Sequence, residues 1–189
     1  FFSVYDSYPA SYRSEDLILG ELDQTEVEIC DFAAFNMEPS GKMMKGLRTT
    51  TFQGILFKAT FPKELAHWVY VCDKKEGCLR KEGEIALMDS PSFNRYFDVF
   101  TEDQILARYA LSPKLMERFC SLKEKFNCPI SMVLRNREVI IALNLGKNSF
   151  EPSFEKSLLE DNTIRDYISS IKGFTDIVKE LGLNNHIWK

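Results

Sequence analysis

Four polar side chains lie close together near the middle of the chain, where the sequence changes from strand-like to helical. They are Thr101, Asp103, Gln104 and Arg108. A guanidinium group beside hydroxyl, amide and carboxylate groups is suited to hold an anionic ligand or an acidic side chain of a partner. We therefore take these four residues as the candidate binding site.

The same four residues also have a structural explanation. The segment 101–104 has the residue types of a capping box, and an acid at position 103 favours the positive end of a helix dipole. For Arg108 two alternatives stay open, an ion pair with Asp98 or Asp103 inside the protein, or a contact with an anionic ligand. The internal ion pair is the simpler alternative, and we expect it.

Recognised catalytic patterns are not evident in the sequence. The histidines His67 and His186 are far apart, and the chain has no Gly-x-Ser-x-Gly elbow, His-Glu-x-x-His helix or P-loop. The spacing of His, Cys and carboxylate residues matches no known metal site, so we expect no metal and no cofactor. The 28 acidic residues nevertheless leave a carboxylate-dependent hydrolase with a cleft active site as the alternative to a binding domain.

A small basic cluster consists of Lys74, Lys75, Arg80 and Lys81. At the tip of a hairpin, such a cluster would gain about 1 kcal/mol per residue beside an anionic lipid surface. Neighbouring glutamates dilute its charge, so a solvated loop is the favoured interpretation.

Composition limits the classes of partner. The chain has 189 residues, with 24 Lys and Arg against 28 Asp and Glu, and a net charge of −4. This acidic balance argues against nucleic acid as a partner, because phosphate backbones select basic surfaces. No repeat or flexible linker divides the chain, so we expect a single domain over residues 1–189.

Cysteine usage and the chain ends bear on the cellular compartment. The five cysteines are odd in number and widely scattered, so we expect them to be reduced. No stretch reaches the length of about 20 apolar residues that a membrane helix needs, and we expect no signal peptide within these residues. The first residue is Phe1 rather than methionine, so we expect the reading frame to begin upstream.

Strands are expected in the first half of the chain, and helices followed by a hairpin in the second half. The expected strands are 17–19, 25–32, a central strand 49–60 ended by Pro62, 67–71 and 84–88. Three short helices begin at Ser90-Pro91, at Thr101 and at Ser112-Pro113. A hairpin over 130–143 turns at Asn136-Arg137, and a helix from Thr163 to Gly182 closes the chain.

These elements predict an α+β fold. We expect a mainly antiparallel sheet of about six or seven strands, with short helices inserted before the last hairpin and the C-terminal helix packed on the sheet.

Five blocks of sequence, in order and spacing, support a family resemblance. They are SEDLILGELDQTEVEICDFAAF, TTFQGILFKATF, DSPSFNRYFDVFTEDQILARYALSPKLMERF, FEPSF and LGLNNHIWK. In these blocks, from about residue 14 to residue 188, the chain closely resembles the uncharacterised bacterial family catalogued as domain of unknown function 3137. The third block, which contains the candidate site, is the most specific. Between Val71 and Gly83 the chain is shorter than the family pattern.

The resemblance implies a membrane-anchored protein with no agreed activity. Members resemble proteins with a coiled stretch and apparent transmembrane helices ahead of this domain, so membrane contact would come only through an upstream segment. A pair of such helices, together with reduced cysteines, implies the cytoplasmic side. We therefore expect a non-catalytic cytoplasmic domain that binds an unknown protein or a small anionic ligand.

Overall fold

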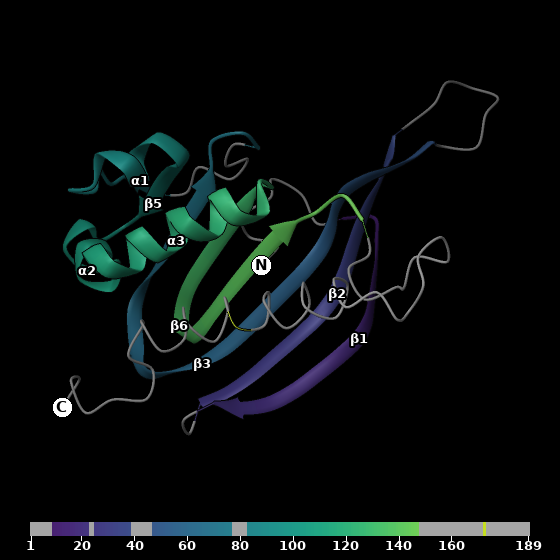
Figure 1. The fold of residues 1–189 in the computed structure, drawn as a ribbon, viewed down its shortest axis with the longest axis horizontal. Helices are drawn as coiled ribbons and strands as arrows, with labels where there is room; N and C mark the ends of the chain where they lie inside the picture. Colours follow the sequence, from purple (N-terminus) through teal and green to yellow (C-terminus); the bar gives the residue numbers. More distant parts are fainter. Residues whose placement is uncertain (1–8, 23–24, 39–46, 77–82, 148–171, 173–189) are drawn as a thin grey trace.

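The computed structural model describes residues 9–22, 25–38, 47–76, 83–147 and 172. These residues confirm the predicted α+β fold, with short helices inserted between strands of a sheet (Figure 1). The elements are β1 Ser11–Leu22, β2 Thr25–Glu38, β3 Leu47–Asp73, β4 Glu84–Ile85, α1 Pro91–Tyr96, β5 Phe97–Thr101, α2 Gln104–Ala110, α3 Pro113–Phe126 and β6 Ile130–Asn144.

The strands of the described residues form one antiparallel sheet. Its order is β1-β2-β3-β5-β4, and β6 pairs with β3 outside this path. The strand predicted over 49–60 lies centrally, as expected, with Ile55 between Asp31 of β2 and Leu143 of β6. At the other end of β3, Val69 lies between Thr101 of β5 and Leu134 of β6.

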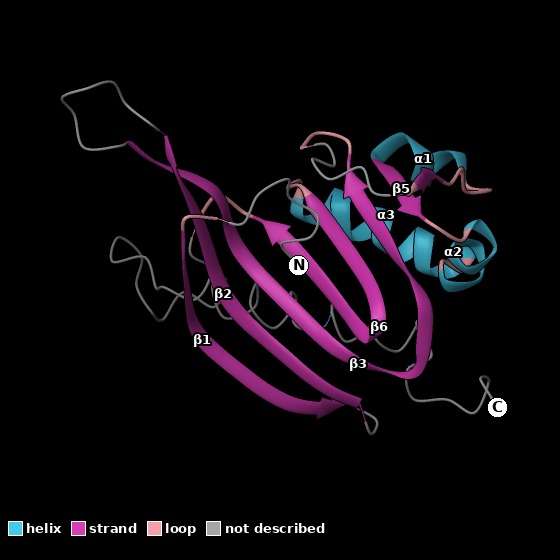
Figure 2. Ribbon diagram, turned by 180° about the vertical axis from the view of Figure 1, so that it is seen from behind, coloured by secondary structure: helices cyan, strands magenta, loops and turns pink. Residues whose placement is uncertain are grey.

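The last strand is the predicted hairpin. β6 reverses its direction (Figure 2), and Asn136 at the turn has a φ of 52°. The two arms meet again where the N–H of Asn144 donates a hydrogen bond to the carbonyl of Pro129 at 2.9 Å. Asparagine tolerates this left-handed conformation well, which explains the position of the turn.

β3 bends around this hairpin instead of ending at Pro62 as predicted. Its residue Gly54 pairs with Asn144 on one arm of β6, and its residue Val71 pairs with Met132 on the other arm. The pairing with β6 shifts register between Thr60 and Val69, so irregular pairing accommodates the bend.

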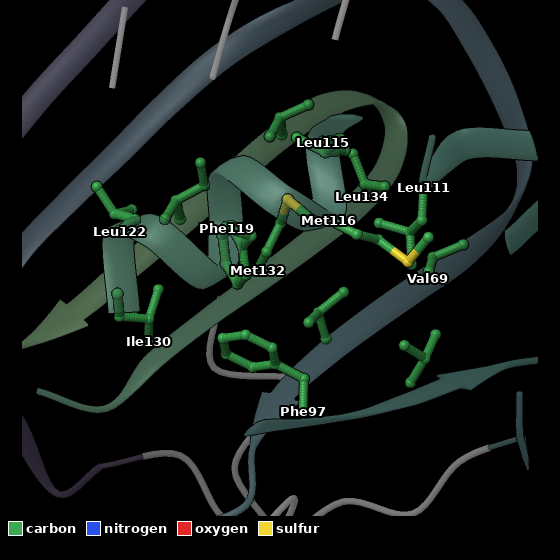
Figure 3. Close-up of a cluster of buried hydrophobic side chains, with 14 of the residues drawn as sticks. Val69, Phe97, Leu111, Leu115, Met116, Phe119, Leu122, Ile130, Met132 and Leu134 are labelled. Atoms are coloured by element: carbon green, nitrogen blue, oxygen red, sulfur yellow. The ribbon is translucent and has the colours of Figure 1, made fainter. Parts of the chain in front are cut away.

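The main core lies between the helices and one face of the sheet (Figure 3). The predicted apolar stripe of α3 is buried there, and Phe119 packs against Phe97 with ring centroids 5.0 Å apart. Alternate residues of β6 line this core, and Val133 faces a smaller cluster with Tyr70 and Phe100. The buried residues of the α3 stripe are Leu115, Met116, Phe119 and Leu122.

Two of the three predicted helix starts are confirmed. The hydroxyl of Ser90 caps α1 and that of Ser112 caps α3, each followed by proline in the first turn. α3 ends at Asn127, which has a φ of 47° and is the left-handed residue of its C-terminal cap.

Other expectations need correction or lie outside the described residues. The predicted strand 84–88 is a strand only over Glu84–Ile85. Cys72 is disulfide-bonded, so the expectation that all cysteines are reduced is wrong, whereas Cys30, Cys120 and Cys128 are free. The fifth cysteine, Cys78, and the predicted C-terminal helix lie outside the described residues, apart from the single position 172.

Candidate functional site

The candidate site gathers at the start of α2, where β5 ends. Thr101 is the last residue of β5 and is completely buried. Its hydroxyl donates a hydrogen bond to the carbonyl of Trp68 at 3.0 Å and accepts one from the N–H of Asp103 at 3.1 Å. Both interactions join backbone segments, so Thr101 positions the turn and does not face a ligand.

Asp103, not Thr101, caps α2. Its Oδ1 accepts hydrogen bonds from the N–H groups of Ile105 at 2.9 Å and Leu106 at 3.0 Å. The prediction that Thr101 opens a capping box is therefore wrong. Its hydroxyl donates to the carbonyl of Trp68, and α2 begins at Gln104, with Asp103 as the N-cap. The carboxylate of Asp103 is used to satisfy helix donors that have no other partner.

Gln104 and Arg108 lie on the side of α2 that faces the segment 84–87. The Nε2 of Gln104 donates to Glu84 Oε2 at 3.4 Å, and the Nη2 of Arg108 donates to the carbonyl of Leu87 at 3.5 Å. Both contacts are long and both side chains belong to the surface. These two contacts place one turn of α2 beside β4 and the residues that follow it.

Arg108 does not form the expected ion pair with Asp98 or Asp103. Asp98 instead pairs with Lys74, with 3.2 Å between Oδ1 and Nζ, and Asp103 caps α2. Among the described residues, Leu87 provides the hydrogen-bond acceptor for Arg108. Most of the donors of the guanidinium group therefore remain available at the surface.

Large apolar side chains are exposed on both segments that meet at Arg108. On α2, Ile105 is 79% exposed and Tyr109 is also exposed. Beside α2, Ile85 is 60% exposed and Leu87 is 68% exposed. We call these four residues together with Arg108 the edge surface. Exposed apolar side chains therefore lie beside the cation of Arg108 in the described part of the chain.

The basic cluster is only partly within the described residues. Arg80 and Lys81 lie outside them. Lys74 pairs with Asp98 and also donates to the carbonyl of Asn94 at 2.6 Å. At least this one of the four cations is occupied by contacts within the protein.

A second group of polar residues, which the sequence analysis missed, is buried where β3 ends. Asp73 and Lys123 form a buried ion pair between their Oδ2 and Nζ atoms. Asp73 Oδ2 also accepts from the N–H of Ile130 at 3.1 Å, and its Oδ1 accepts from the N–H of Lys75 at 2.9 Å. Lys123 further donates to the carbonyl of Cys128 at 2.8 Å.

Glu76 adjoins this pair. Asn144 donates a hydrogen bond to Glu76 through its Nδ2 and accepts one from the N–H of Gln53 at 3.2 Å through its Oδ1. Burial raises the pKa of Glu76, and the negative charge of Asp73 raises it further. We call Asp73, Lys123 and Glu76 the buried polar cluster.

The contacts of the buried polar cluster are structural. Both oxygens of Asp73 and two donors of Lys123 are already bound inside the protein. One signal for it was in the sequence, because Lys123 lies four positions after Phe119 and therefore on the apolar side of α3. A lysine there must find a buried anion.

The remaining residues that could act in catalysis are either exposed, as His67 is, or unreactive, as Cys128 is. His67 Nδ1 lies 3.1 Å from Glu102 Oε2, and both side chains are exposed. Burial raises the pKa of the Cys128 thiol to about 11, which removes its nucleophilic form at neutral pH. Within the described ranges, no cluster of His, Cys, Asp and Glu has the arrangement of a metal site.

The described residues define an α+β protein in which a short helix, α2, flanks β4, the last described strand on this side of an antiparallel sheet. The chain belongs to the family described as protein of unknown function DUF3137, whose model matches residues 50–183. This match contains α2, β4 and both members of the buried ion pair.

Other comparisons add little. No curated protein matches the chain. Among solved structures, the crystal structure of the mycobacterial trehalose monomycolate transport factor A, TtfA, is similar at a TM-score of 0.47 and 13% identity, covering 87% of this chain and 72% of that one. Of the helices within the described residues, none combines the length and the apolar character that a membrane crossing requires.

Proposed function

We propose that this chain is a non-catalytic binding domain that holds another protein through the edge surface. The observation that carries this proposal is the position of Arg108, whose guanidinium group lies between exposed apolar residues and has only one long contact within the described residues. A cation of this kind can pair with an acidic group of a partner while the apolar residues around it exclude water.

A protein partner suits this surface better than a small anion. A small anion is usually held by several converging donors, and Thr101 and Asp103 do not contribute because both are used within the fold. The exposed apolar side chains of Ile105 and Leu87 make no favourable contact with a small anion, whereas a protein partner can bury them.

The carboxylate-dependent hydrolase has no comparable support. Asp73 and Glu76 are neighbouring acids in the described part of the chain, and each accepts hydrogen bonds from within the protein. Glu28 and Glu138 are also close together, but both pair with Lys58 at the surface. A general acid or base must reach a substrate proton, and both oxygens of Asp73 are already occupied.

We further propose that the domain is carried by a membrane-anchored bacterial protein and faces the cytoplasm, as a pair of upstream helices would imply. In that reducing compartment the disulfide of Cys72 would be open. Trapping of thiols in living cells by rapid alkylation tests this directly. A Cys72 that is still oxidised after trapping would place the domain on the oxidising side of the membrane instead.

Site-specific photocrosslinking tests the binding function. We would replace Ile105 with p-benzoyl-phenylalanine in the full-length protein within bacterial membranes. A matched control carries the same group at Ser121, an exposed position on α3. We expect a discrete adduct with one partner at position 105 that is absent at position 121 and is weakened by Arg108→Ala. Identical adducts at both positions, or none at position 105, would contradict the proposal.

A further inference from the structure

We draw no further inference here: the strongest candidate, the exposed apolar surface patch of Leu17, Ile18 and Leu19 on β1 at the other end of the described sheet, carries none because nothing in the described part of the structure shows what covers it.

Discussion

Lys123 of α3 and Asp73 at the end of β3 are 50 positions apart in the chain, yet they form a buried ion pair. The exposed fractions of their side chains are only 5% and 1%. The pair joins the end of the bent strand to the helix that covers the sheet, and the contact between Asp73 and Ile130 extends it to the start of β6.

Removal of one member of this pair should destabilise the fold strongly. We expect Lys123→Met to lower the free energy of unfolding by about 3–5 kcal/mol, because it leaves the Asp73 carboxylate buried without its cation. Urea denaturation measures the change. The control is Lys74→Met, which breaks the exposed pair with Asp98 and should cost about 1 kcal/mol or less. Equal effects of the two variants would show that the buried pair is not structural.

Because its pKa is raised, Glu76 should favour the folded state more in acid than at neutral pH. Its pKa is raised in the folded state above the ordinary value of 4.5, so its contribution to stability is complete below that value and is lost as the pH rises through the folded pKa. Glu76→Gln keeps an oxygen for Asn144 without the charge. We expect this variant to melt at a higher temperature than the wild type at pH 7, and the difference to shrink near pH 4. A lower melting temperature at pH 7 would contradict this assignment.

Gly54 lies where the backbones of β3 and β6 approach closely. A Cβ atom at this position would lie 2.8 Å from the backbone nitrogen of Leu145 and closer still to the carbonyl oxygen of Leu143. We expect Gly54→Ala to cost about 3 kcal/mol or more, because the backbone of β6 must move. Gly20→Ala is the control, since its new Cβ would meet only Val27 at 3.7 Å, an ordinary contact. Chemical denaturation of both variants tests the difference, and a tolerated Gly54→Ala would refute the close approach.

The disulfide of Cys72 should be detectable in the purified protein. We expect thiol titration of the unfolded chain to detect the thiols of Cys30, Cys120 and Cys128 before reduction, and that of Cys72 only after reduction. Reduction should lower the stability by about 2 kcal/mol, since the unfolded chain gains freedom. Cys72→Ala should melt at the same temperature with and without reductant. Five free thiols before reduction would contradict the disulfide.

Local sequence patterns were sufficient to predict most elements of the described fold. The Ser-Pro starts of α1 and α3 and the turn at Asn136 are properties of a few adjacent residues, because caps and tight turns depend on local backbone geometry. Alternation and helical spacing of apolar residues likewise predicted the central strand and the buried side of α3. The sequence by itself therefore determined the fold class and brought Thr101, Asp103, Gln104 and Arg108 to one helix start.

The roles of those residues depend on contacts between distant segments, which only the tertiary structure decided. The buried hydroxyl of Thr101 is satisfied by the carbonyl of Trp68, 33 positions earlier, and Asp98 pairs with Lys74 instead of Arg108. The bend of β3 and the ion pair of Asp73 with Lys123 arise in the same way. A one-dimensional pattern records which side of an element is apolar, but the partner of a polar group is set by the three-dimensional packing of elements far apart in the chain.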